Sequence, residues 1–157
     1  MRIGIFSDSH DNILKVKKAV SFFNKHKVGF VFHAGDFIAP FVIPKIQALK
    51  CDWRGVFGNN DGERRGLSKI SKRKIQKAPL RINLAGRRIT LVHELGAIDL
   101  KSEKADLIIF GHTHSPEVKR RDDKMLINPG ECGGWVTGKF TVALVDLAFL
   151  TAKIYKI

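Results

Sequence analysis

Residues 1–10, MRIGIFSDSH, decide how the rest of the chain is interpreted, because an apolar run ends there in metal-ligating residue types. Ile3–Ser7 predicts a buried strand, and Asp8-Ser9-His10 follows it directly. Asn12–Lys25 then predicts an amphipathic helix. The residues expected to face inward are Ile13, Leu14, Val16, Val20 and Phe23.

The strand-then-helix pattern continues through the first half of the chain. Val28–His33 and Trp53–Phe57 predict two further strands, and Ala39–Leu49 predicts a helix between them. Alternation of strand and helix is typical of a parallel sheet with helices packed against it. We therefore expect the first half to form an α/β unit.

The second half changes to short strands separated by turn residues. Leu107–Phe110 predicts one short buried strand, and the other strands pair as antiparallel hairpins. The expected hairpins are Leu80–Leu84 with Arg88–His93, Val118–Arg121 with Met125–Asn128, and Lys139–Val145 with Leu150–Tyr155. An α/β half followed by such strands indicates two packed sheets flanked by helices. Without a repeat or a Pro/Gly/Ser linker, residues 1–157 are expected to form a single domain.

The composition excludes several classes of protein. Hydrophobic residues make up 44% and charged residues 27%, which are values of globular rather than collagenous or disordered chains. No apolar run approaches the roughly 18 residues of a membrane span, so no membrane partner is expected. Cys51 and Cys132 form no CxxC motif, which favours a reducing cytoplasm.

The chain is strongly basic, with 28 Lys and Arg against 15 Asp and Glu, a net charge of +13. This excess favours an acidic partner or substrate such as a phosphate ester, nucleic acid or anionic lipid, with a merely solvated basic surface as the alternative. The densest basic run lies within Ser68–Lys77, over residues 69–77. It predicts a solvated helix or loop, with phosphate contacts as its alternative role.

Metal-ligating residue types recur directly after the apolar strands. Ligands of α/β sheets bind beyond the carboxyl ends of strands, so these loops are expected to converge. Imidazole and carboxylate groups suit Zn, Mn, Fe, Co and Ni. The loops are Asp8-Ser9-His10, Gly35-Asp36, Gly58-Asn59-Asn60-Asp61, His93-Glu94 and Gly111-His112-Thr113-His114.

Two pairs in these loops have a spacing of two residues. Asp8 and His10, on an extended segment, would point the same way and share an ion, and His112 and His114 are expected to turn to one pocket. Each motif alone has a plainer interpretation: Asp8 or Ser9 as a helix cap, Gly-Asp as a turn. The order of all five loops along one chain is specific.

Two histidines lie outside the five loops. His26 is expected at a helix C-terminus, where a positive charge is favourable. His33 ends a predicted strand and is expected to pack or to support a ligand rather than to bind metal.

The ordered set resembles the calcineurin-like metallophosphoesterases, whose pattern is Asp-x-His, Gly-Asp, Gly-Asn-x-Asp, a single His and Gly-His-x-His. The length resembles that of the small single-domain bacterial and archaeal phosphodiesterases of this superfamily. The resemblance extends from Met1 to about Gly130 and includes Asn128-Pro129-Gly130. It implies two packed mixed β-sheets flanked by helices, an α/β/β/α sandwich.

The resemblance also implies a dinuclear centre with two divalent metal ions. Mn²⁺ is favoured, with Ni²⁺, Co²⁺, Fe²⁺ and Zn²⁺ as alternatives. One ion would be held by Asp8, His10 and His114, and the second by Asn59, His93 and His112, while Asp36 bridges both. The catalytic roles fall to Asp36, Asn59, Asn60 and His93.

Two positions depart from the family pattern. Asn60 stands where the larger family often has a histidine, and an amide cannot donate a proton to a leaving group as an acid does. Glu94 follows His93 where glycine is usual, and it is expected to point to solvent or to support the site.

The function implied is that of a hydrolase, a phosphodiesterase in which a metal-bridging hydroxide attacks a small phosphate diester in line. The alternatives are a phosphomonoesterase or nuclease on the same site, or a non-catalytic protein-binding scaffold. A nucleic-acid substrate is less favoured because the chain has no long insertions. Phe149 and Ile157 are expected to complete the core, with a homodimer surface as the alternative.

Overall fold

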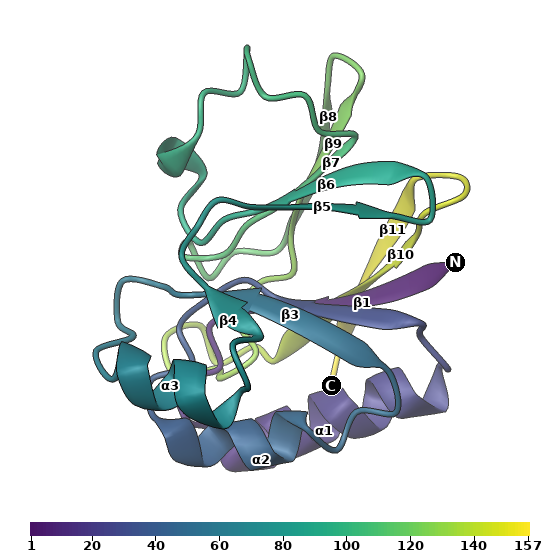
Figure 1. Cartoon of the computed structure of the whole chain (residues 1–157). Helices are drawn as coiled ribbons and strands as arrows, with labels where there is room; N and C mark the ends of the chain where they lie inside the picture. The colour runs from purple at the N-terminus through teal and green to yellow at the C-terminus, as the bar shows by residue number, and fades with distance from the viewer.

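The computed structural model describes residues 1–157 and places two mixed β-sheets face to face (Figure 1). In the first sheet β1, β2, β3 and β4 run parallel, and the hairpin β10–β11 adds an antiparallel edge next to β1. The strand order is β11-β10-β1-β2-β3-β4. Its strands are β1 Arg2–Phe6, β2 Phe30–His33, β3 Asp52–Val56, β4 Ile75–Gln76, β10 Thr141–Asp146 and β11 Thr151–Lys156.

The second sheet has the order β5-β6-β7-β9-β8. The three predicted hairpins are confirmed, but the second half is not simply antiparallel, because β6, β7 and β9 run parallel to one another. This parallel core orients three strand ends in one direction. Its strands are β5 Leu80–Leu84, β6 Arg87–Leu91, β7 Leu107–Ile109, β8 Glu117–Arg121 and β9 Lys124–Asn128.

Three α-helices cover the outer face of the first sheet: α1 Ile13–Lys25, α2 Ile43–Ile46 and α3 Arg64–Ile70 (Figure 1). The prediction of one continuous helix over Ala39–Leu49 is wrong. A 3-10 turn, η1 Pro40–Val42, comes first and is followed by α2, which is a single α-helical turn. Pro44 explains the break, because its ring and missing N–H disrupt a helix interior. No helix is both long and apolar enough to cross a lipid bilayer.

The outer face of the second sheet has only a thin cover. A one-turn 3-10 helix, η2 Leu95–Ala97, and the segment around it lie there. Leu95, Ile98 and Leu100 pack against Ile108 and Leu126 of the sheet.

The alternation of side chains along β1 builds two cores. Ile3 and Ile5 face the second sheet, within a cluster of 16 buried residues between the sheets. Phe6 faces the helices, within a cluster of 18 buried residues. Gly4 also faces α1, and a Cβ there would lie 2.5 Å from the Phe23 ring. A larger residue at this position would push α1 away from the sheet.

Details of α1 differ from expectation. Asn12 caps the helix by accepting a hydrogen bond from the Lys15 amide (3.2 Å), so capping by Asp8 or Ser9 is wrong. Leu14 is 72% exposed because it lies two residues, about 200° of helical rotation, before the buried Val16. The helix buries Val16, Ala19, Val20 and Phe23.

The two C-terminal apolar residues have different environments. Ile157 packs against the helix-side core as expected. Phe149 is 78% exposed in the turn between β10 and β11, so its assignment to the core is wrong.

A buried carboxylate stabilises the second sheet. Glu103 accepts hydrogen bonds from the Thr90 hydroxyl (3.1 Å) and from Arg81 (2.7 Å). The Arg81 hydrogen bonds are the main cause that lowers the pKa of Glu103, against the raising effect of burial. Since the native pKa is lowered, this stabilisation is present above the ordinary carboxyl pKa and is lost as the pH falls through the native value.

Glu103→Ala is expected to lower the free energy of unfolding by about 1–3 kcal/mol at neutral pH, because buried Thr90 loses its acceptor while half-exposed Arg81 reaches water. Urea unfolding would measure the loss, and the difference from wild type should shrink in acid. The exposed Glu94→Ala is the matched control and should change stability little. An equal effect of both substitutions would contradict the assignment.

Candidate metal centre

Six loops meet at one end of the two sheets, three from each. Parallel strands β1, β2 and β3 end in the Asp8, Asp36 and Asn59 loops, and β6 and β7 end near His93 and the 111–114 loop. All five predicted loops therefore converge, as expected for the carboxyl ends of parallel strands. The sixth loop follows β9 and carries Glu131.

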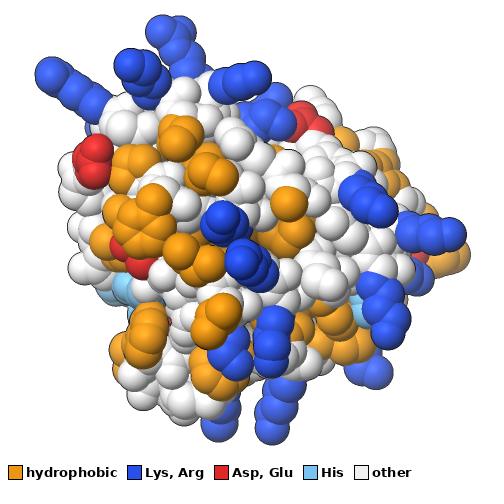
Figure 2. All heavy atoms as spheres, turned by 90° about the horizontal axis from the view of Figure 1, so that it is seen from below, with side chains coloured by type: hydrophobic (Ala, Val, Ile, Leu, Met, Phe, Trp, Pro, Cys, Tyr) orange, Lys and Arg blue, Asp and Glu red, His pale blue; other side chains and the backbone are white.

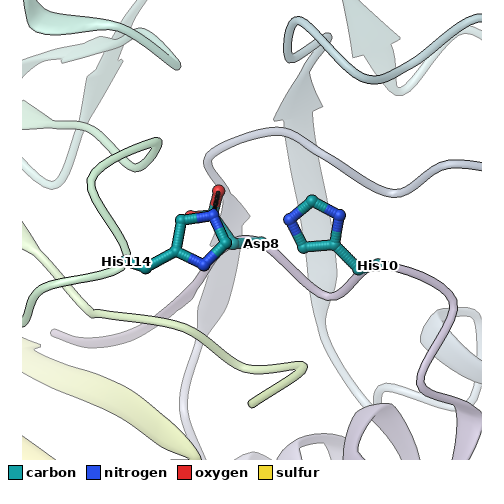
Figure 3. Close-up of side chains that lie close together, drawn as sticks. All are labelled: Asp8, His10 and His114. Atoms are coloured by element: carbon teal, nitrogen blue, oxygen red, sulfur yellow. Dashed lines mark ion pairs between the residues drawn. The ribbon is translucent and has the colours of Figure 1, made fainter. Parts of the chain in front are cut away.

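The first cluster consists of Asp8, His10 and His114, whose ligand atoms all lie within 4.8 Å of one another (Figure 3). His114 Nε2 is 3.5 Å from Asp8 Oδ1, and the two imidazoles stack with ring centroids 5.2 Å apart. His10 Nε2 is buried without a hydrogen-bond partner. An orphaned imidazole nitrogen beside a carboxylate fits a metal ligand, since burial without a partner is costly.

The second cluster consists of Asp8, Asp36 and His93, again within 4.8 Å. His93 Nδ1 lies 2.8 Å from the Ala34 carbonyl oxygen, which assigns the ring proton to Nδ1 and leaves a lone pair on Nε2. That Nε2 lies 2.8 Å from Asn59 Oδ1, so two lone-pair donors face each other. A cation between such donors would resolve their repulsion.

Asp36, a member of the second cluster, also approaches His10 of the first. Its Oδ2 is 3.6 Å from His10 Nε2 and 3.5 Å from His93 Nε2. The same carboxylate accepts hydrogen bonds from the Asn60 amide nitrogen (2.9 Å) and from Asn60 Nδ2 (2.7 Å). A Cβ at Gly58 would lie 2.1 Å from Asp36 Oδ1, so glycine is required for this approach.

The loops do not follow the geometry assumed for them. Asp8 and His10 have φ values of 51° and 41°, so they share a cluster through a left-handed turn rather than along an extended segment. His112 and His114 also have positive φ, at 69° and 58°, and both lie beside Asp8 but next to different imidazoles. His112 lies beside His93, with ring centroids 5.2 Å apart and its Nδ1 3.0 Å from Asn59 Oδ1, whereas His114 stacks on His10.

Glu131 is a site residue that the sequence analysis missed. Its Oε1 lies 3.4 Å from His114 Nδ1, and it is 1% exposed. Burial alone would raise the pKa of Glu131, but hydrogen bonds from Val136 and Thr137 hold it below its usual range. One feature of the sequence could have indicated Glu131 as a site residue. It follows Gly130 just after a predicted strand, as Asp36 follows Gly35.

Asp61 and Arg64 hold the loop that carries Asn59. The Asp61 carboxylate accepts from the backbone amides of Asp36 (3.2 Å), Ile38 (2.8 Å) and Gly58 (2.8 Å). Arg64 donates to the Gly58 and Asp61 carbonyl oxygens. Asp61 was part of the Gly-Asn-x-Asp motif but had no predicted role, because hydrogen bonds to distant amides are invisible in a motif.

The remaining histidines and Glu94 lie as expected. His33 is fully buried, stacks on Phe37 with centroids 3.6 Å apart and has Nε2 3.0 Å from Ser9 Oγ. Burial lowers its pKa well below the usual value, so it packs as a neutral ring that supports the Ser9 loop. His26 is the C-cap of α1. Glu94 is exposed to solvent.

The basic run folds as the end of α3, a turn and β4. Lys69, Lys72 and Arg73 are exposed, and Lys74 pairs with Asp52. The expectation of a solvated segment is confirmed for these cations, although Ile75 is buried in the helix-side core. Across the helix-covered face, Lys and Arg side chains are dispersed among apolar and uncharged surface (Figure 2).

The fold and these contacts define a class of protein: two mixed sheets whose strand-end loops gather Asp and His groups able to bind metal ions. The model of the calcineurin-like phosphoesterase superfamily domain matches residues 1–148. Phosphodiesterase MJ0936 of Methanocaldococcus jannaschii is 35% identical over 154 residues, which cover 93% of each chain. The protein belongs to the calcineurin-like phosphoesterase superfamily.

Solved structures agree. An archaeal phosphodiesterase superposes with a TM-score of 0.94 at 33% identity, covering 100% of both chains. Vps29 of Entamoeba histolytica shares the fold, with a TM-score of 0.73 at 18% identity over 100% of this chain and 98% of its own.

Proposed function

We propose that the protein is a metal-dependent phosphodiesterase that hydrolyses a small phosphate diester. The observation that carries this proposal is the position of Asp36 Oδ2, 3.6 Å from His10 Nε2 and 3.5 Å from His93 Nε2. A single carboxylate oxygen thus faces an imidazole from each half of the site. The relationship to the phosphodiesterase of M. jannaschii supports the same reaction class.

The donor set fits two divalent metal ions. One ion is assigned to Asp8, His10 and His114, the second to Asn59, His93 and His112, and Asp36 is assigned to both. The four imidazoles favour first-row ions, with Mn²⁺ proposed and Ni²⁺, Co²⁺, Fe²⁺ and Zn²⁺ as alternatives. Bound together, two such ions clamp phosphoryl oxygens and bring the pKa of a coordinated water toward about 7.

The protein side chains select and orient the substrate. Asp8 and Asp36 bring two negative charges to a site assigned two dications, so the site stays positive and attracts a phosphate monoanion. The Nε2 lone pair of His93 faces the other ligand atoms, which makes it a ligand rather than a free base. Asn60 places an amide next to Asp36, where it can donate a hydrogen bond but not a proton.

Several features favour a small substrate over the alternatives. The chain has no long insertions that could form a nucleic-acid channel, which disfavours a nuclease. All seven proposed ligand positions carry coordinating side chains, and five of them, Asp8, His10, Asp36, His93 and His114, fall in the two clusters, which disfavours a metal-free scaffold. We propose that residues 1–157 form one domain. We also propose that the protein acts in the cytoplasm, which the free thiols of Cys51 and Cys132 support.

Activated aryl phosphodiesters are expected to react faster than the matching monoesters. With a hydroxide counted beside the two ions, the site would carry about one net positive charge, which a monoester dianion would overcompensate, and Asn60 supplies no acid. Asn60→His restores an acid, whose help is typically worth about 10²–10⁴-fold. We expect this variant to raise the ratio of monoester to diester turnover. The measurement is kcat/KM for bis(4-nitrophenyl) phosphate, 4-nitrophenyl phosphate and phenyl phosphate at equal metal concentration. Phenyl phosphate has the poorest leaving group and should gain most from the added acid.

Asn83→His is the matched control, because Asn83 is exposed on β5, outside the six site loops. It should leave the ratio unchanged. A wild-type preference for monoesters, or an unchanged ratio in Asn60→His, would show that Asn60 does not set the substrate class.

A further inference from the structure

Trp135 is an exposed aromatic side chain attached to the edge of the candidate metal centre. It is 69% exposed, yet its Nε1–H donates a hydrogen bond to the His10 carbonyl oxygen (3.0 Å). The other tryptophan, Trp53, is 2% exposed and belongs to the core. An indole whose edge is held while most of its surface meets solvent has a face free for a ligand.

The segment that carries Trp135 is tied to the first metal-site loop. The backbone amides of Cys132 and Gly133 donate to the carbonyl oxygens of Ser7 and Asp8, both at 2.9 Å. Asn12 Nδ2 donates to the Gly133 carbonyl oxygen (2.8 Å). Residues 132–133 are therefore held against the loop that supplies Asp8 and His10.

The turn itself is braced from inside the site. Glu131, 3.4 Å from His114 Nδ1, accepts hydrogen bonds from the amides of Val136 (3.0 Å) and Thr137 (2.9 Å). A further bond from the Gly138 amide to the Gly134 carbonyl oxygen (3.1 Å) closes the turn. The backbone of the turn is thus held against the centre, and the indole is anchored through its Nε1–H, so ordering the ring on a planar group costs little entropy.

A phosphate diester bound at the centre carries two ester groups, one that leaves and one that is retained. The loops around the metal-site residues present mostly carboxylate, imidazole and amide groups, whereas Trp135 and its 74% exposed neighbour Val136 are apolar. Ligand sites combine a few polar groups with apolar walls, and bases and aryl rings stack on aromatic side chains.

We propose that Trp135 forms an aromatic subsite that stacks on the ester substituent of the substrate, so that the preferred substrates are small phosphodiesters bearing a planar aromatic ring or nucleobase. This inference rests on the proposed phosphodiesterase function and names its substrate class. Trp135 contacts the substrate in this proposal and sets specificity; it takes no part in bond breaking.

The kinetic test compares bis(4-nitrophenyl) phosphate with methyl 4-nitrophenyl phosphate, which share a leaving group and differ in the retained ester. Trp135→Ala is expected to lower the ratio of their kcat/KM values about tenfold, the loss typical of a removed stacking partner. Trp135→Phe keeps a ring without the Nε1–H and should retain most of the ratio. Phe149→Ala removes an exposed aromatic ring in the β10–β11 turn, and should change nothing.

A binding test does not depend on turnover. Calorimetry on the manganese-loaded protein compares phenylphosphonate with methylphosphonate, and wild type should prefer the phenyl compound about tenfold, a preference lost in Trp135→Ala. If wild type hydrolyses neither diester but shows this preference, the proposed function fails and the subsite stands. The subsite is overturned if the preference is absent, survives in Trp135→Ala, or is lost equally in Trp135→Phe.

Discussion

Asp36→Ala is expected to lower kcat/KM for bis(4-nitrophenyl) phosphate by more than about 100-fold. Changes around metal ligands typically cost about 10–100-fold, and a carboxylate assigned to two ions should exceed that range. The fold should survive, because the Asp36 backbone amide is held by Asp61 (3.2 Å) independently of the lost side chain. Steady-state kinetics would measure the loss of activity, metal analysis the loss of bound ions, and a thermal melt the survival of the fold.

A matched control is Asp123→Ala, which removes a 78% exposed carboxylate from the β8–β9 turn. It should leave both activity and metal content unchanged. Near-normal hydrolysis by Asp36→Ala at saturating metal would show that Asp36 does not bridge two ions.

Removal of metal should abolish hydrolysis, and only some ions should restore it. After chelation and dialysis, Mn²⁺ or a neighbouring first-row ion is expected to recover activity, whereas Ca²⁺ should recover little. The reason is the imidazole share of the proposed ligands, His10, His93, His112 and His114. Ca²⁺ prefers oxygen ligands, whereas imidazole suits first-row transition metals.

As a control, Mn²⁺ is added to the protein that was treated with Ca²⁺. Its hydrolytic activity should then recover, which would show that Ca²⁺ did not damage the protein. Titration with each ion, followed by the rate of diester hydrolysis, gives the comparison. Full activity with Ca²⁺ alone, or in excess chelator, would contradict an imidazole-rich dinuclear centre.

The α1 and η1–α2 regions show where sequence patterns succeed and fail. A long amphipathic period predicted α1 almost to the residue, because burial of one face dominates a helix of 13 residues. Over Ala39–Leu49 the apolar spacing was also helical, but Pro44 has no N–H to continue a helix from Pro40, so α2 begins only at Ile43. Leu14 is apolar but lies about 200° around the helix from Val16, so it faces solvent although it belongs to the apolar run.

The pairing of strands that are far apart in the sequence could not be predicted from local sequence patterns. Local patterns predicted the hairpins, and in the turn between β5 and β6 both Ala85 and Gly86 adopt the positive φ of a tight turn. The parallel alignment of β6, β7 and β9 joins segments far apart in sequence and depends on the packing of the two sheets. That alignment placed Glu131 at the site, which is why it was missed.

The sequence by itself determined which chemical groups are available. Carboxylate, imidazole and amide residues occur in a fixed order, each directly after an apolar run, and this order also identifies the family. The tertiary structure decided which of those groups meet. His112 lies beside His93 whereas His114 stacks on His10, Asp36 approaches an imidazole of each cluster, and Trp135 reaches His10 across 125 positions of the sequence. Strand periodicity is local, whereas loop conformation and contacts between sheets depend on the packing of the whole chain.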